Sequence, residues 1–307
     1  MNEYDVLIIG GGAAGLNAAL VLGRARRRVA VVDDGRPRNA PALHMHGFLS
    51  RDGTPPAELL ALGRKEVIGY GGDVISGTVT TLTRGFRATL DNGTTILARR
   101  ALITTGLRDQ IPDIPGLAER WGRDVLHCPY CHGYEVRDQP LGVLGGDQNA
   151  VTHALLIRQW SNDVILFTDN QSPTREQLEA LHARGVAVES RPISRMCVEA
   201  DALRGVELED GPVVLRSALF VRPTLAPNDA LLRGVGCERD EGGWTLHDSD
   251  GATSVAGLYV AGNASDPRAQ VITAAGQGSA AAIAINNDLV ADDTHVAVDR
   301  LRHHELH

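Results

Sequence analysis

The feature that most constrains the fold is an apolar run that ends in a cluster of glycines. Residues 5–9 form this run, and a glycine-rich segment, residues 10–15, follows it directly. Such a run predicts a buried parallel strand, and the Ala/Leu-rich residues 16–24 predict a helix. A second apolar run, residues 29–32, ends in Asp33. This order predicts a βαβ unit of an α/β fold.

The glycine spacing, G-x-G-x-x-G, is typical of a dinucleotide site. Gly10 permits the turn, Gly12 lets the backbone approach a pyrophosphate, and Gly15 lets helix and strand pack closely. The N-terminus of the helix then faces the phosphates. Asp33, about 20 residues further on, can accept a hydrogen bond from a ribose hydroxyl. The sequence therefore predicts a bound dinucleotide.

Length, charge and composition restrict the partners. The chain has 307 residues, enough for two domains, and 43% of them are hydrophobic. The formal charge of −8 argues against nucleic acid or an anionic membrane as the main partner. No signal-type segment follows the first residues, and no apolar run approaches the ~18 residues that span a bilayer. We therefore expect a cytoplasmic protein without a membrane partner.

A second strand–turn–helix–strand order begins at residue 141 and predicts a second βαβ unit. The other expected elements are a helix at 55–70, a β-meander at 74–82, 86–90 and 94–100, a strand at 101–106, a second meander within 193–220, and a helix at 270–287. Two proline-containing stretches, 111–116 and 223–227, predict linkers.

A pair of cysteines lies just ahead of the second unit. Cys128 and Cys131 are separated by two residues and flanked by His127 and His132. In such a turn the two sulfurs can close a small ring, and a thiolate is favoured when cationic groups or a helix N-terminus lie nearby. The pair therefore predicts an electron relay. The histidines and cysteines show no metal-site spacing, so we expect no metal.

These pieces, in this order, resemble the low-molecular-weight thioredoxin reductases, which have the class II pyridine nucleotide-disulfide oxidoreductase fold. The late segments 257–263 and 269–278 add to the resemblance, which covers nearly the whole chain. It implies an FAD-binding Rossmann-like (three-layer ββα) domain at residues 1–111 and 223–307. It also implies an inserted, smaller NAD(P)-binding-like Rossmann domain at 112–222, and a homodimer.

The resemblance also implies contacts with FAD. Asn263 would bond the ribityl or phosphate region, and Val271 would lie near the isoalloxazine, at a helix N-terminus aimed at its pyrimidine end. The expected cofactor-binding residues are Gly10, Gly12, Ala13, Ala14, Gly15, Asp33, Asp34, Arg38, His46, Gly106, Gly262, Asn263, Gln270, Val271 and Ile272.

The second glycine-rich turn departs from the pattern of a nicotinamide dinucleotide site. It reads Gly145-x-Asp147-x-x-Ala150, with an acid where the backbone must touch a pyrophosphate. Like charges ~4 Å apart repel by about 1 kcal/mol in water and about 4 kcal/mol at an effective dielectric of about 20. After the next strand, Asp169 stands where NADPH-dependent members carry bases. NADPH is therefore doubtful, although a shifted glycine register that still cradles a phosphate stays open.

The residue after the second cysteine is a second departure. Thioredoxin reductases usually carry an acid there, whereas this chain has His132. The form Cys-Pro-Tyr-Cys-His resembles the FAD-dependent dithiol oxidases of holomycin and gliotoxin biosynthesis. That resemblance implies oxidation of a small-molecule dithiol to its disulfide, with O2 as acceptor and H2O2 as product. It makes Cys128 the outward sulfur, Cys131 the sulfur facing the flavin, His132 the acid/base, and His127 a group that holds a thiolate.

Three alternatives stay open. The first is an NADPH-dependent thioredoxin-disulfide reductase with thioredoxin as its partner. The second is a thioredoxin reductase-like enzyme that receives electrons from ferredoxin or an unknown donor. The third is a flavin-bound redox sensor, against which the complete cysteine relay argues. Cys197 and Cys237 are isolated in sequence and predict inert thiols.

Overall fold

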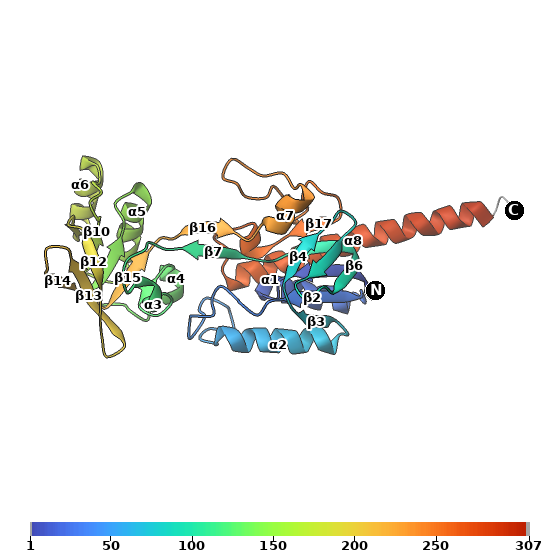
Figure 1. Ribbon diagram of the computed structural model, residues 1–307, viewed down its shortest axis with the longest axis horizontal. Helices are drawn as coiled ribbons and strands as arrows, with labels where there is room; N and C mark the ends of the chain where they lie inside the picture. The colour runs from blue at the N-terminus through green and yellow to red at the C-terminus, as the bar shows by residue number, and fades with distance from the viewer. Residues whose placement is uncertain (1, 305–307) are drawn as a thin grey trace. The chain divides into compact units, whose positions relative to one another are not determined.

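The computed structural model describes residues 2–304, and its contacts divide the chain into two compact units (Figure 1). The first unit comprises Met1–Ala40, Pro55–Arg108 and Ala226–His307, and the second comprises Pro41–Thr54 and Asp109–Leu225. The expected division placed its boundaries at 111/112 and 222/223 and kept residues 41–54 in the first domain. The contacts instead group Pro41–Thr54 with the cysteine-bearing unit.

The first unit is built on a seven-stranded sheet. Its order is β3 (Asp73–Ser76), β2 (Val29–Asp33), β1 (Asn2–Ile9), β6 (Thr95–Ile103), β5 (Arg87–Leu90) and β4 (Val79–Leu82), with β17 (Leu258–Val260) beside the second half of β6. The strands β1, β2, β3 and β17 run parallel to their neighbours, and β4 and β5 are antiparallel. The central strands are apolar on both faces because both faces are covered.

Three helices cover one face of this sheet: α1 (Ala13–Arg24), α2 (Pro56–Gly69) and the first half of α8 (Val271–His304). A short helix, α7 (Ala230–Val235), packs on the other face. The helices α1 and α8 approach each other closely, since a Cβ at Gly278 would lie 2.1 Å from Ala14 O. The Asn17 side chain also donates to Ala275 O at 2.7 Å. This packing fixes the first turn of α1 beside the first turns of α8.

Three expectations for this unit are corrected. The run 74–82 is two strands, since β3 pairs parallel with β2 whereas β4 pairs antiparallel with β5, and Gly77 at φ 153° breaks the run. The predicted strand 101–106 continues β6 without a break up to Ile103. Residues 223–227 contain the boundary between the two units, as expected of a linker, but they also form a strand, because β16 (Thr224–Pro227) pairs with β7 (Leu107–Gln110).

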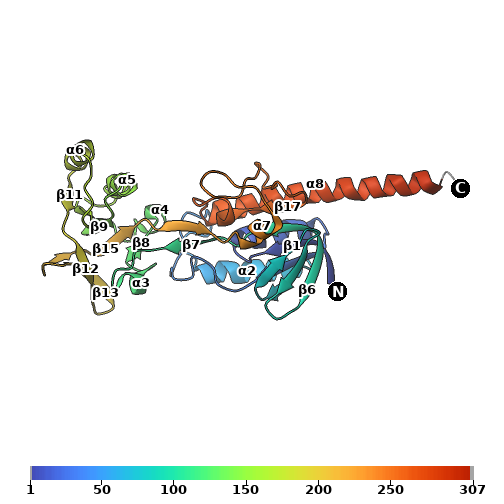
Figure 2. The same ribbon diagram turned by 45° about the horizontal axis from the view of Figure 1, so that its top comes forward.

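The second unit has a five-stranded parallel sheet in the order β11 (Val186–Glu189), β10 (Val164–Phe167), β9 (Leu141–Leu144), β15 (Ala218–Val221) and β8 (Val125–Leu126). Helices α5 (Gln148–Ile157) and α6 (Arg175–Ala183) lie on one face (Figure 2). An antiparallel sheet of β12 (Ile193–Glu199), β13 (Ala202–Leu208) and β14 (Val213–Leu215) covers the other. Two Rossmann-like sheets confirm the predicted α/β class.

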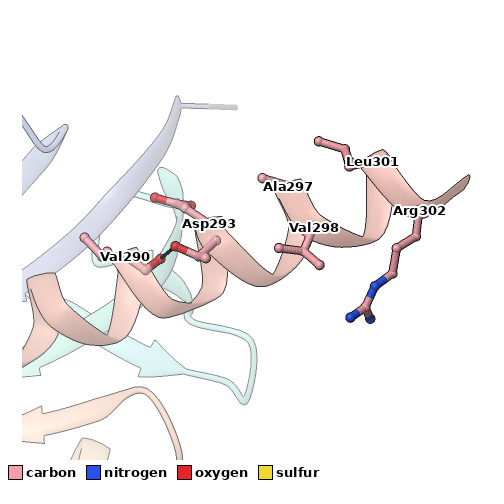
Figure 3. Close-up of a pocket in the computed structure, with 7 residues that line it drawn as sticks. Val290, Asp293, Ala297, Val298, Leu301 and Arg302 are labelled. Carbon is pink, nitrogen blue, oxygen red and sulfur yellow. Dashed lines mark hydrogen bonds between the residues drawn. The ribbon is translucent and has the colours of Figure 1, made fainter. Parts of the chain in front are cut away.

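The helix α8 is longer than predicted, running to His304 rather than to residue 287. The part of α8 up to Leu289 buries Ala281, Ile285 and Leu289 against the sheet, and the part after Leu289 is largely exposed. A shallow apolar groove on the second half is lined by Val290, Asp293, Thr294, Ala297, Val298, Leu301 and Arg302 (Figure 3). Within residues 2–304, no helix has the length and apolar character needed to cross a membrane.

Two glycines of α8 provide a matched test of its packing on α1. Gly278→Ala should lower the free energy of unfolding by about 1–3 kcal/mol, because the new methyl group overlaps the Ala14 carbonyl. Gly276→Ala should be neutral or stabilising by up to about 1 kcal/mol, since no atom lies within 4 Å of its added Cβ. Urea unfolding in excess FAD measures both, and equal effects would contradict the close approach.

Candidate functional site

Cys128 and Cys131 form a disulfide at the carboxyl end of β8. Cys128 keeps an extended backbone, with φ −98° and ψ 112°, and is the N-cap of the short helix α4 (Pro129–His132). Pro129 suits the first helical position because its fixed φ is helical and it needs no N–H partner. The N–H groups of Cys131 and His132 both donate to Cys128 O at 3.2 Å. This turn brings the two sulfurs together, and both remain partly exposed.

His132 ends this helical turn and is partly buried. Burial lowers the pKa of His132, the Glu135 carboxylate partly offsets this, and the nearby His46 lowers the pKa further. The imidazole is therefore neutral at neutral pH, in the form that accepts a proton from a thiol. Glu135 was not singled out from the sequence, because its charge gains meaning only from its position beside this ring.

His46 belongs to the second unit, with the Pro41–Thr54 segment. Its Nε2 lies 3.4 Å from Glu135 Oε1, and its Nδ1 lies 3.3 Å from Asp52 Oδ2. The Gly47 N–H also donates to Asp52, and these contacts hold the pKa of Asp52 below its usual value. The structure therefore brings His46 together with the helix turn of the cysteines and leaves its expected contact with FAD a prediction.

His127 and a second, buried histidine flank the other side of the turn. His127 Nδ1 lies 3.4 Å from Val221 O, at the end of β15. His153, on α5, is only 5% exposed and stands edge-to-face on Phe220. Burial, together with the positive charges of His127 and Arg222, lowers the pKa of His153 to about 4. Sequence reasoning missed His153 and Arg222, since neither belongs to a motif and both gain meaning only from their tertiary contacts.

The N-terminus of α1 is open to a ligand. Gly12 is its N-cap without a side-chain cap, and the first turn carries no acid. A Cβ at Gly12 would meet no atom within 4 Å, whereas a Cβ at Gly15 would lie 1.9 Å from Gly10 O. Gly15 therefore serves packing, and Gly12, with Ala13 and Ala14, leaves the helix N–H groups free for a pyrophosphate. These residues fit FAD.

The carboxylate of Asp33 ends β2 and lies beside the same turn. It accepts from Gly11 N at 3.1 Å and pairs with Arg64 at 2.9 Å. The following acid, Asp34, is exposed and pairs with Arg36 at 2.8 Å. Asp33 therefore orders the glycine turn, and its remaining lone pairs suit a ribose hydroxyl.

Asn263 is hydrogen-bonded to Arg38, which is also expected to contact FAD, and to the loop before α8. Its Oδ1 accepts from Arg38 at 3.3 Å, and its Nδ2 donates to Asp266 O and Ala269 O. It lies in the short 3₁₀ helix η1 (Gly262–Ala264). These bonds place Arg38 beside the loop that leads into α8.

The start of α8 is held by Gly262, whose N–H donates to Gln277 Oε1 at 3.0 Å. Gln270 O accepts from Ala274 N, so the long helix begins at Val271. Ile272 is 40% exposed. The residues that are expected to contact FAD at the start of α8 therefore lie in one loop and one helical turn.

Gly106 follows β6 on the same unit. It has φ 69°, and its carbonyl accepts from Asn228 N. A left-handed backbone of this kind favours glycine. Gly106 therefore lies in the first unit, as does every other residue expected to contact FAD except His46.

The N-terminus of α5 is closed, in contrast to that of α1. Asp147 is its N-cap, and Asp147 Oδ1 accepts from Ala150 N at 2.8 Å. A Cβ at Gly146 would lie 2.3 Å from Gln171 Cβ, so Gln171 covers the glycine that would approach a phosphate. Asp169 bonds Ile193 N at 2.9 Å and is not directed at a ribose. These residues do not fit a nicotinamide dinucleotide.

Comparison with known proteins reveals relatives along most of the chain. The family described as "Pyridine nucleotide-disulphide oxidoreductase" matches residues 4–278. Thioredoxin reductase sirT of Leptosphaeria maculans is 32% identical, over 94% of this chain and 95% of that protein. Thioredoxin reductase tcpT of Claviceps purpurea is 32% identical, over 95% of this chain and 96% of that protein.

Solved structures agree with this similarity. The crystal structure of HlmI is 54% identical with a TM-score of 0.96, covering 97% of this chain and 96% of that chain. An oxidoreductase from Agrobacterium tumefaciens is 36% identical with a TM-score of 0.88, covering 94% of this chain and 99% of that chain.

A charge placed at the open helix N-terminus should expel the flavin without harming the fold. Gly12 has φ −77°, which any residue adopts, and both Asp and Asn are good N-caps. Gly12→Asp should bind FAD at least ~10-fold more weakly than the neutral, equally large Gly12→Asn, because its carboxylate repels the pyrophosphate. Flavin fluorescence titration measures the two affinities. Equal affinities would show that no phosphate lies there.

Proposed function

Given that this chain belongs to the pyridine nucleotide-disulphide oxidoreductase family, we propose that it oxidises a small-molecule dithiol to an intramolecular disulfide, with O2 as acceptor and H2O2 as product. The protein is an oxidoreductase that uses FAD. The observation that supports this direction of electron flow is the Asp147 carboxylate, which occupies the N-terminus of α5. Electrons then enter from the thiols rather than from a nicotinamide.

The exchange begins when a substrate thiolate attacks Cys128 Sγ. A substrate–Cys128 disulfide forms, the Cys128–Cys131 bond breaks, and the electron pair of that bond goes to Cys131. The second substrate thiolate then attacks the substrate sulfur, and Cys128 leaves as a thiolate. The substrate has lost two electrons, which the cysteine pair holds. FAD, when bound, would supply a two-electron acceptor for the reduced cysteine pair and a donor to O2.

His132 is the proposed base of this exchange. Its ring is neutral at neutral pH because burial lowers its pKa, so it can take the proton of a substrate thiol. Its neighbour Glu135 stabilises the imidazolium that results. His127, fixed against Val221 O, borders the other side of the disulfide and is proposed to hold a thiolate.

The relatives' names favour a second candidate, since two of them are thioredoxin reductases. This enzyme would run the relay in the opposite direction, from NADPH to the disulfide of thioredoxin. The capped N-terminus of α5 and the covered Gly146 argue against it. A reductase supplied by a protein donor such as ferredoxin needs no such site and stays an alternative. The homodimer implied by the resemblance also stays a prediction.

The first test removes each sulfur in turn. Cys128→Ser and Cys131→Ser should keep bound FAD yet lose O2 uptake with dithiothreitol by at least ~100-fold, because each breaks the relay. Cys197→Ser, at a thiol outside the relay, is the matched control and should retain full O2 uptake. An oxygen electrode measures the rates.

Two results would contradict the proposal. Normal O2 uptake in both serine variants would exclude the relay. Anaerobic bleaching of the flavin by one equivalent of NADPH at micromolar concentration would show that the second unit binds a nicotinamide after all, and would favour the reductase.

The pH dependence tests the role of His132. The rate should fall as the pH drops through the pKa of His132, which lies below its usual 6.5, because only the neutral ring accepts a proton. Glu135→Gln removes the charge that raises this pKa, so the acid limb should move to lower pH. Glu179→Gln on α6 is the control. The measurement is O2 uptake between about pH 5 and 9. An acid limb that stays at the same pH in Glu135→Gln would contradict this role.

A further inference from the structure

Arg222 follows β15, directly after the strand that borders the cysteine turn. Its side chain is exposed, and within residues 2–304 it makes no hydrogen bond or ion pair. Most other arginines near this sheet are paired, for example Arg216 with Asp163 and Arg191 with Glu189. An unpaired cation at the edge of a redox turn is available to interact with an anion.

Strand pairing brings the chain at Arg222 near the cysteine turn. The parallel pair β15–β8 aligns Leu219 with Val125 and Phe220 with Leu126. The strand β8 ends at Leu126 and the chain bends at His127, whose Nδ1 still lies 3.4 Å from Val221 O. Arg222 and Cys128 are the next residues of these two segments. Neighbouring strands lie about 4.8 Å apart, which an arginine side chain easily spans.

Side-chain alternation directs Arg222 toward α5. Phe220 packs in the core under α5. Because side chains alternate along a strand, Arg222, two residues after Phe220 in the same segment, continues on that side. The position of His153 on α5 agrees with this, since Arg222 lies close enough to disfavour protonation of its ring.

From this register we propose that Arg222 is the cation that stabilises the thiolates at Cys128, both the one entering from the substrate and the Cys128 thiolate that leaves. This rests on the proposed exchange at Cys128. In the first step the substrate approaches as an anion, and in the second the electron pair of the mixed disulfide goes to Cys128 Sγ. A guanidinium beside that sulfur favours both charges. The site therefore selects substrates that react as thiolates.

Other titratable groups share this part of the second unit and stay unchanged in the variants below. They are His127 and His132 on the cysteine turn, His153 on α5, Glu135 after α4, and His46 and Asp52 on the 41–54 segment. A change at Arg222 alone therefore reports on the guanidinium.

The test measures thiolate formation at Cys128 directly. In the flavin-bound Cys131→Ser protein, Cys128 stays reduced, and its alkylation by iodoacetamide is followed by peptide mass spectrometry against pH. Arg222→Gln should slow alkylation of Cys128 at pH 7 by about tenfold and move the profile to higher pH, while Arg222→Lys should restore most of the rate. Alkylation of Cys197 serves as the reference thiol in the same digest.

The control is Arg175→Gln on α6, whose side chain is 92% exposed and pairs with Glu179. An unchanged Cys128 profile in Arg222→Gln, or an equal change in Arg175→Gln, would overturn the proposal. If Arg222→Gln fails to fold, the pH profile of Cys128 alkylation is measured at increasing salt concentration in the protein that retains Arg222. Screening of an exposed cation should move the profile of the otherwise unchanged protein to higher pH, and a salt-independent profile would overturn the proposal. Alkylation needs neither O2 nor a dithiol, so its outcome is separate from that of the oxidase assay.

Discussion

The N–H groups in the first turn of a helix need an acceptor, and the two βαβ units of this chain supply it in opposite ways. At α1 the chain supplies none, because Gly12 has no side chain and the first turn has no acid. At α5 the chain supplies its own carboxylate from Asp147. The same local fold is therefore a cofactor cradle in one unit and a closed turn in the other. The route by which electrons can reach the flavin depends on this difference.

The cysteine turn gains its chemistry from groups that are distant in sequence. His132 lies beside Glu135 and His46, and the latter arrives on a segment that precedes the turn by some eighty residues. His127 is fixed by the end of β15, and His153 is contributed by α5. A parallel sheet gathers such groups because the carboxyl ends of its strands meet at one edge. The second unit thus keeps the Rossmann-like sheet and uses its edge to surround a disulfide.

Much of this arrangement was predictable from residues 5–33, 127–132 and 141–167, because strand, glycine turn and helix are local patterns. The acid at position 147 was recognised from the same spacing, but its role as the N-cap of α5 was not predicted. The split between β3 and β4 was missed because both halves are equally extended and only their partners differ. The strand β16 was missed because its flanking prolines predict a linker, whereas its pairing with β7 comes from tertiary structure. The association of Pro41–Thr54 with the second unit has no periodic signal at all.

The helix α8 has a consequence of its own. It is a single element of 34 residues, about 51 Å long, yet the sheet supports only its beginning. The last bonds to the sheet side come from Arg27, Arg99 and Arg100, which reach Asp292 and Asp293. Beyond them, as far as His304, the described ion pairs are local, such as that of His295 with Asp299. In a single chain, the rate of amide hydrogen exchange should therefore rise steeply after Asp293. One unbroken helix then has a stable N-terminal part and a C-terminal part that opens readily.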